Sequence, residues 1–224
     1  MTRHLAIGDI HGCINALTTL VEFVAPCPDD TIVTLGDYVD RGPDSAAVVD
    51  FVIKLGESHN LVPLRGNHEI MMLDSREIKS WFESWQGYGG AETLLSYAQS
   101  EGDPGSFADI PDTHMDFLEN RLLSYYECET HLFVHANADA DKELKDQPDS
   151  SLFWRRYKDP ERHRSGKIMV CGHTEQKSGL PVSNGHAICI DTWAYGDGWL
   201  SCLDVGSGTV WQANEAGETR SFDL

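Results

Sequence analysis

The sequence predicts an α/β fold in which helices cover a parallel sheet and a helical segment is inserted at about residues 70–126. Three observations lead to this prediction. Short apolar runs alternate with helical patterns between residues 4 and 67, strand patterns are missing from about 70 to 126, and apolar runs return from residue 131. Strand–helix–strand alternation is typical of parallel sheets with helices on their faces.

The N-terminal part contains three predicted strands separated by two predicted helices. The strands are expected at residues 4–9, 31–37 and 60–67. Residues 12–25 have apolar side chains at helical spacing, and residues 43–56 form a helix with Pro43 near its start and Gly56 near its end. Pro63 has no N–H to donate to a sheet, so the third strand is expected to be bulged or to lie at an edge.

The remainder of the chain is read as a helical cap followed by a second group of strands. Helical patterns occupy residues 81–99 and 113–126. Further strands are expected at residues 131–136, 167–173, 186–192, 199–205 and 208–213. The last two, joined at Gly206-Ser207, indicate a hairpin. We therefore expect residues 1–224 to form one domain with the cap as an insertion.

The composition excludes several classes of function. The formal net charge is −19, and proteins that bind nucleic acids or anionic membranes need clustered Lys and Arg. The chain contains no run of eighteen or more apolar residues, so a membrane span is not expected. The six cysteines have no CxxC spacing, and the first strand begins too early to leave room for a signal peptide. These features predict a cytoplasmic protein with reduced thiols.

Side chains that bind metals follow five of the predicted strands. The residues are Asp9, His11, Asp37, Asn67, His135 and His173. Parallel strands place their carboxyl ends along one edge of a sheet, which is where ligands bind in open α/β folds. We therefore expect these six side chains to meet in one crevice.

The donor types indicate a pair of divalent ions. Carboxylate oxygen and neutral imidazole nitrogen suit manganese, iron, zinc or magnesium, whereas thiolate sites use cysteines that the crevice lacks. Six ligands are too many for one open tetrahedral site but fit two ions that share a bridging carboxylate. Asp37 is the expected bridge, because it follows the middle of the first three strands. Two such ions would make the crevice locally positive and able to hold a phosphate in an acidic protein.

The segments GDIHG, GDYVDRG and RGNHE together resemble the signature of metallophosphoesterases of the phosphoprotein phosphatase family. VHA at residues 134–136 and CGHT at 171–174 complete the pattern. GNHEIMML and SLFWRRY resemble the compact bacterial and phage lambda-type serine/threonine protein phosphatases. The resemblance implies a four-layer α/β/β/α sandwich that holds two metal ions, manganese or an iron-containing pair.

The resemblance also implies a role for individual residues. Asp9, His11 and Asp37 match the ligands of the first ion, and Asp37, Asn67, His135 and His173 match those of the second. His68 matches a general acid that Asp40 orients. Phosphate-binding roles are expected for Arg41, Asn67, Arg65 and Arg156, with Arg155 as the alternative to Arg156.

The expected reaction is hydrolysis of a phosphomonoester by a water that the two metals activate. A phosphoprotein or phosphopeptide is the first expected substrate, and a symmetrical diadenosine tetraphosphate hydrolase is the alternative. GNHE favours the first, because those hydrolases typically carry GNHD. Trp81, Trp85 and Tyr88 of the cap could stack a base and so favour the second. An inactive binding module is disfavoured, because every expected ligand and the general acid are present.

Overall fold

The computed structural model describes residues 2–224, and its centre is a pair of sheets packed face to face. The six-stranded sheet has the order β11-β10-β9-β1-β2-β3 and the five-stranded sheet has the order β4-β5-β6-β8-β7. The strands of the first are β1 His4–Ile7, β2 Thr31–Thr34, β3 Asn60–Pro63, β9 Leu200–Asp204, β10 Thr209–Ala213 and β11 Thr219–Asp223. Those of the second are β4 Tyr125–Glu127, β5 His131–Val134, β6 Ile168–Cys171, β7 Val182–Ser183 and β8 Ala187–Cys189.

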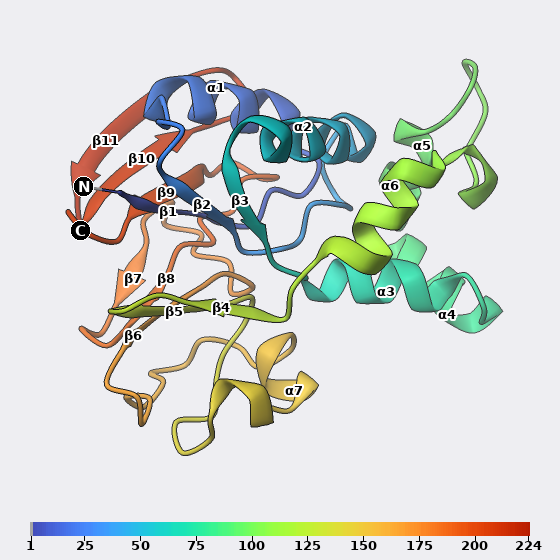
Figure 1. Cartoon of the computed structure of the whole chain (residues 1–224). Helices are drawn as coiled ribbons and strands as arrows, with labels where there is room; N and C mark the ends of the chain where they lie inside the picture. The colour runs from blue at the N-terminus through green and yellow to red at the C-terminus, as the bar shows by residue number, and fades with distance from the viewer. Residues whose placement is uncertain (1) are drawn as a thin grey trace.

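Helices cover the outer faces of the two sheets and complete the four-layer arrangement (Figure 1). Helices α1 Ile14–Val24 and α2 Ser45–Ser58 lie over the six-stranded sheet, while the short helix α7 Asp149–Leu152 lies beyond the five-stranded sheet. Helix α2 begins where the side chain of Asp44 accepts a hydrogen bond from the backbone N–H of Ala47, a standard N-cap. The predicted α/β fold class is thus confirmed.

Alternation along the strands explains why both faces of each sheet are buried. In β1, Leu5 and Ile7 pack against the helices α1 and α2, whereas Ala6 faces the other sheet. In β5, Phe133 joins this layer between the sheets, and its neighbours on the strand face the side of α7. Successive side chains of a strand point to opposite faces, so each strand contributes to two layers of core.

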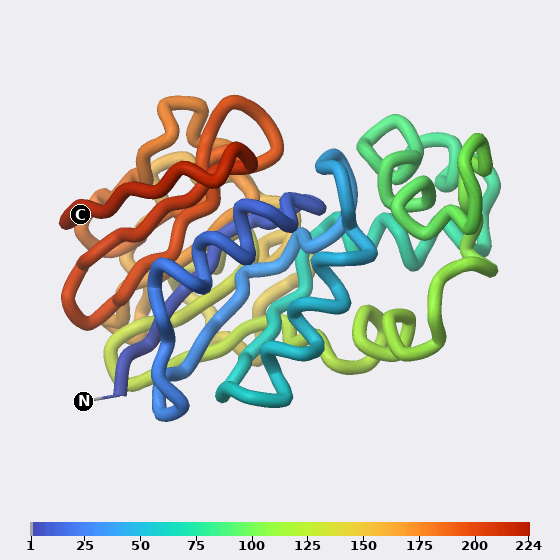
Figure 2. The backbone as a smooth tube through the Cα atoms, turned by 90° about the horizontal axis from the view of Figure 1, so that it is seen from above, coloured from blue at the N-terminus to red at the C-terminus, as the bar shows by residue number. Residues whose placement is uncertain are grey.

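Residues 67–121 form a helical segment that lies at one side of the sandwich (Figures 1 and 2). Its elements are α3 Asn67–Ser75, α4 Lys79–Trp85, η1 Gln86–Gly90, α5 Ala91–Ser96, η2 Phe107–Asp109, α6 Asp112–Asp116 and η3 Phe117–Arg121. The helix expected at 113–126 ends at Arg121, and Tyr125 and Tyr126 instead pair with β5 in an antiparallel ladder. Aromatic residues favour strands, and pairing with β5 outweighs the local helical pattern.

Two further strands were not expected from the sequence. Strand β7 has two exposed residues, and β11 alternates between exposed and half-buried positions at the edge of its sheet. Neither segment carries the apolar run that marks a buried strand. The expected hairpin is present as the antiparallel pair β9–β10, and β3 lies at the edge of its sheet, as Pro63 indicated. The segment between β5 and β6 also contains the 3₁₀ turn η4 Leu144–Asp146.

The strand pairing determines where the functional loops meet. β1, β2 and β3 are parallel and in register, so that Ile7, Thr34 and Pro63 lie side by side at one end of the sheet. β5 and β6 of the second sheet are likewise parallel. The loops that follow all five strands therefore leave from the same edge of the sandwich. No helix within residues 2–224 is both long enough and apolar enough to span a bilayer.

Candidate metal centre and active site

The loops at this edge hold their polar side chains with unusual backbone angles. His11, Asp37, Asp40, Arg41 and His173 all have φ between 47° and 74°, in the left-handed region. Side chains other than glycine rarely adopt this region, and such residues gather at functional sites where the surrounding fold compensates for the strain. The backbone here is thus shaped to aim specific side chains, which ordinary turns do not require.

Two glycines of the motifs are required by close approach to the carboxylates. A Cβ at Gly66 would lie 2.1 Å from Oδ1 of Asp37, and one at Gly172 would lie 1.8 Å from Oδ1 of Asp9. Any other residue at either position would displace the carboxylate. These contacts explain why a glycine directly precedes the functional residue in the third and fifth motifs.

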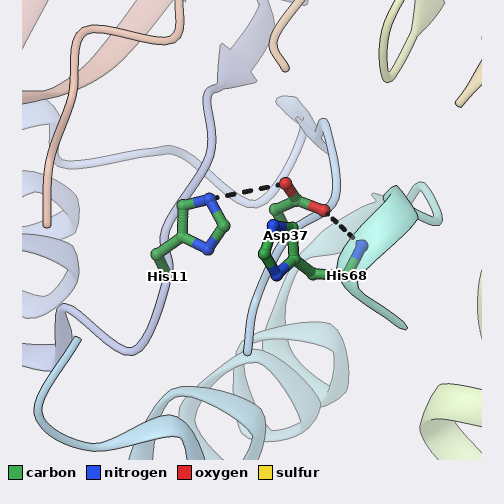
Figure 3. A group of neighbouring side chains, drawn as sticks. All are labelled: His11, Asp37 and His68. Atoms are coloured by element: carbon green, nitrogen blue, oxygen red, sulfur yellow. Dashed lines mark hydrogen bonds and ion pairs between the residues drawn. The ribbon is translucent and has the colours of Figure 1, made fainter. Parts of the chain in front are cut away.

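Asp37 is at the centre of the site, as its place on the middle strand predicts. Its Oδ2 lies 3.4 Å from Nε2 of His11 and its Oδ1 lies 3.5 Å from Nε2 of His135. Oδ1 also accepts a hydrogen bond of 3.0 Å from the backbone N–H of His68 (Figure 3). Burial opposes ionisation of Asp37, but His68, which retains its proton, and the hydrogen bond from the backbone N–H of His68 hold the pKa of Asp37 below the usual range. One carboxylate thus faces imidazoles on both sides.

The histidines present unprotonated nitrogens to the same space. Nδ1 of His11 lies 2.9 Å from the carbonyl of Val39, and Nδ1 of His135 lies 2.8 Å from the carbonyl of Leu35. A carbonyl only accepts, so each Nδ1 carries the proton and each Nε2 has a lone pair. Burial lowers the pKa of both imidazoles and so favours this neutral form.

Two such lone pairs face another acceptor at short range. Nε2 of His173 lies 3.1 Å from the carbonyl of Trp154, so Nδ1 of His173 has a lone pair as well. Nε2 of His135 lies 2.9 Å from Oδ1 of Asn67, and Nδ1 of His173 lies 2.8 Å from the same oxygen. Oδ1 of Asp9 is buried and has no hydrogen-bond partner among residues 2–224, while its Oδ2 accepts from the backbone N–H of His173. Acceptors that are buried together without protons between them need a cation.

The residues present therefore fit two divalent ions. Potential ligand atoms form two clusters that share one carboxylate, namely His11, Asp37 and His68, and Asp37, His135 and His173. Asp9 and Asn67 add oxygens next to these clusters through their contacts with His173. The structure brings all six expected ligands together at one edge.

His68 and Asp40 form a buried hydrogen-bonded pair beside the metal ligands. Nδ1 of His68 donates to Oδ2 of Asp40 at 2.6 Å, which leaves Nε2 available for another partner. Burial works against the charged imidazole, but the carboxylates of Asp37 and Asp40 hold the pKa of His68 above its ordinary value. The arrangement can thus retain a proton on His68, as donation to a leaving group requires.

The helical cap holds the pair in place. Nε1–H of Trp85 donates to Oδ2 of Asp40 at 2.8 Å, and the hydroxyl of Thr93 donates to Oδ1 at 2.7 Å. Sequence reasoning did not identify these contacts, because Trp85 and Thr93 lie 45 and 53 residues from Asp40. No local spacing in the sequence signals contacts of this length.

Glu69 is a second residue whose role the sequence did not reveal. It is fully buried, and its carboxylate accepts from the backbone N–H groups of Asp37, Tyr38, Val39 and Gly66 at 2.8–3.3 Å. The carboxylate therefore joins the loop after β2 to the turn after β3. Through these bonds Glu69 fixes the backbone that presents Asp37 and Asn67.

Arg41 lies at the mouth of the site between aromatic and acidic neighbours. Its guanidinium lies 4.7 Å from the centre of the Tyr195 ring and 3.6 Å from Oε1 of Glu175. Tyr195 also donates a hydrogen bond to Glu175. Nη1 of Arg41 is 2.9 Å from Nε2 of His11, so this guanidinium already contacts the expected ligand set.

The other arginines expected at the phosphate lie in different settings. Arg65 donates to the backbone carbonyls of Leu118 and Glu119 in the cap, at 3.4 and 2.8 Å. Arg155 forms an ion pair with Asp139, and exposed Arg156 shares with it a cavity of about 640 Å³ that reaches Asn137. Phosphate binding by Arg65 or Arg156 stays a prediction, and the observed contacts of Arg65 join the sandwich to the cap.

Comparisons with solved structures agree with the observed architecture. A putative diadenosine tetraphosphatase is 21% identical, with a TM-score of 0.68 that covers 99% of this chain and 93% of that chain. A cold-active protein-tyrosine phosphatase of a Shewanella species is 17% identical, with a TM-score of 0.65 over 99% and 80% of the two chains. A serine/threonine phosphatase from Saccharomyces cerevisiae is 18% identical, with a TM-score of 0.63 over 100% and 80%. At these identities the likeness shows the fold alone.

Curated relatives match over a shorter segment. Symmetrical bis(5'-nucleosyl)-tetraphosphatases of an Acidovorax species and of Edwardsiella ictaluri are each 46% identical, over 68 and 70 residues. These matches cover 30% and 31% of this chain and 24% of each relative, so the chain matches about a quarter of their length. The model of the calcineurin-like phosphoesterase family matches residues 2–199. The chain therefore belongs to the calcineurin-like phosphoesterases, a family of hydrolytic enzymes.

Proposed function

We propose that this protein hydrolyses phosphate monoesters with water, using two divalent ions held by the six converging ligands. The observation that carries the proposal is the buried cluster of acceptors around Asp37, in which one oxygen of Asp9 has no hydrogen-bond partner within residues 2–224. Ions bound there would lower the pKa of a water molecule and supply positive charge next to a phosphoryl group. We expect manganese, with iron, zinc or magnesium as alternatives of the same donor preference.

The chain's own residues bind the phosphoryl group and protonate the leaving oxygen. Arg41 lies beside the ligand set, where its guanidinium can bind phosphoryl oxygens and stabilise their charge. His68 donates the proton of Nε2 to the leaving oxygen, and Asp40 keeps the imidazole oriented through Nδ1. Asn67 presents its amide beside both ligand histidines and the expected position of the phosphate.

A phosphoserine or phosphothreonine protein is the first candidate substrate. The alkoxide of serine or threonine is a poor leaving group, so its departure benefits from an acid with a raised pKa. His68 has that property through its carboxylate neighbours. The GNHE motif, which contains this acid, also supports this candidate.

A bis(5'-nucleosyl) polyphosphate is the second candidate. The curated relatives named symmetrical bis(5'-nucleosyl)-tetraphosphatases share 46% identity with this chain over 68–70 residues. Because the match covers less than a third of the chain, it supports the reaction more strongly than the choice of substrate. The substrate is selected by residues that surround the shared chemistry.

The proposal is tested by hydrolysis assays with manganese and with a chelator. The substrates are a phosphoserine and phosphothreonine peptide panel and diadenosine tetraphosphate, compared by kcat/KM. We expect turnover that requires manganese and that falls about 100-fold or more in His68→Asn, since a general acid contributes about 10²–10⁴-fold. The matched control is His59→Asn, because His59 lies at the end of α2 and its side chain contacts the hydroxyl of its neighbour Ser58.

Each result has a definite meaning. A preference for the peptides supports a protein phosphatase, and a preference for the dinucleotide supports nucleotide hydrolysis. Turnover that persists with chelator, or an equal loss in His68→Asn and His59→Asn, would contradict the proposed chemistry.

A further inference from the structure

An aromatic pocket opens between the helical cap and the loop after α7. It has a volume of about 300 Å³, and its walls include Ile70, Trp81, Trp85, Tyr88 and Trp154. Three of the rings are unusually exposed, with 49% for Trp81, 59% for Tyr88 and 43% for Trp154. Large aromatic side chains that gather around a cavity while remaining open to solvent are typical of ligand sites.

The pocket adjoins the proposed catalytic residues on two sides. Trp85 forms part of its wall and also donates to Asp40, the partner of His68. Ile70 and Met71 line it and follow His68 on the same helix α3, which extends from the sandwich toward α4 (Figure 1). On the opposite side, the backbone carbonyl of Trp154 lies 3.1 Å from Nε2 of His173. The pocket therefore lies next to both the general acid and a ligand histidine.

The chemistry of the walls suits a flat, uncharged ring. Indole and phenol faces stack with nucleobases, whatever the base sequence, because every base has a π-face. Among residues 2–224, Asp74 is the only charged residue that lines the pocket, so a phosphate would be repelled there. Its carboxylate can accept from an amino group at the edge of a base. The volume lies at the small end of the range of ligand pockets, about 300–1,000 Å³, which suits one base.

We propose that this pocket binds the base of a nucleotide substrate and stacks it among Trp81, Tyr88 and Trp154. The inference rests on the proposed hydrolysis, because the proposed metal site would bind the phosphoryl half of the same substrate. The base occupies the pocket, the sugar bridges to His68, and the phosphate lies beside Arg41. This arrangement favours the second candidate substrate over the first, because a phosphopeptide without an aromatic side chain near the phosphate leaves the pocket empty.

The first test compares substrates with and without a base. Trp81→Ala and Tyr88→Ala are assayed with diadenosine tetraphosphate, adenosine monophosphate and glycerol phosphate. We expect the ratio of kcat/KM for either nucleotide to that for glycerol phosphate to fall about tenfold or more. Phe23→Ala is the matched control, because Phe23 is an exposed aromatic on α1, outside the pocket, and should leave this ratio unchanged.

The second test measures binding without any turnover. The probe is 2-aminopurine riboside, a fluorescent nucleoside that has no phosphate and is quenched when it stacks on an aromatic ring. We expect the wild-type protein and Phe23→Ala to quench the probe with equal affinity. Trp81→Ala should bind the probe at least fivefold more weakly, and Trp81→Phe should restore the wild-type affinity.

The two tests separate this inference from the proposed reaction. If no substrate is hydrolysed with manganese, the proposed hydrolysis is contradicted. Quenching of the probe still tests whether the pocket binds a base. An unchanged ratio in both alanine variants, or quenching that Trp81→Ala does not weaken, would overturn the assignment.

Discussion

Glu69 gives the sharpest prediction about how the site is built. Its Oε2 accepts from the N–H groups of Asp37 and Gly66, and its Oε1 accepts from those of Tyr38 and Val39. The substitution Glu69→Gln keeps the shape but replaces one oxygen with an amide NH₂. Two buried backbone donors then face another donor and lose their acceptor.

The cost follows from the number of bonds lost. Each buried polar group left without a partner costs about 1–3 kcal/mol, so two cost about 2–6 kcal/mol. For a chain of this size that corresponds to a decrease in Tm of about 4–24 °C. Thermal and urea unfolding should be measured at pH 8 without metal, because burial and then the charge of Asp37 raise the pKa of Glu69 to about 7.

The matched control is Glu57→Gln on the exposed face of α2, which should change the free energy of unfolding by less than about 0.5 kcal/mol. If Glu69→Gln were as stable as this control, the four hydrogen bonds would not hold the loop of Asp37. The reasoning about the site's framework would then be wrong.

Three further predictions concern the residues around Asp37. His68→Asn should lower kcat about 100-fold or more with unchanged metal content by elemental analysis, whereas loss of metal would identify His68 as a ligand. Trp85→Phe removes the donor to the Asp40 carboxylate and should cost about 1.5–3 kcal/mol in urea unfolding, and an unchanged stability would contradict the role of that bond. Burial lowers the pKa of His173 to about 4 in the metal-free folded protein, below the ordinary value of about 6.5. Between pH 4 and pH 6.5, about the range of these two pKa values, the unfolded chain therefore binds more protons than the folded protein. The free energy of unfolding should therefore fall as the pH decreases from about 6.5 to about 4, and it should fall less steeply in His173→Gln than in the wild-type protein. Equal slopes of this free energy against pH in the two proteins would refute the prediction.

The sequence predicted the part of the fold that local patterns determine. Short continuous apolar runs mark strands such as β1 and β5, because both of their faces are buried in layers of core. Strand β11 was not predicted, because its residues alternate between exposed and half-buried and form no apolar run. The prediction that a helix continues to Tyr126 was wrong, because Tyr125 and Tyr126 pair with β5, a contact that a local pattern does not encode.

The same distinction applies to the site. Asp9, His11 and Asp37 were predicted from their strand ends, because parallel register alone brings those ends together. The supports for Asp40 were missed, because Trp85 and Thr93 reach it only through the packing of the cap on the sandwich. Residues whose role depends on such long-range contacts leave no spacing that a single sequence can reveal.

The most direct test of the account counts the ions in the site. Manganese binding to the metal-free protein should be measured by titration calorimetry and elemental analysis, with Asp37→Asn as the comparison. The account predicts two ions per chain in the wild-type protein and loss of both tight sites in Asp37→Asn, because each carboxylate oxygen faces a different imidazole. One ion in the wild-type protein, or two tightly bound ions in Asp37→Asn, would contradict the bridging role of Asp37 and the dinuclear centre built around it.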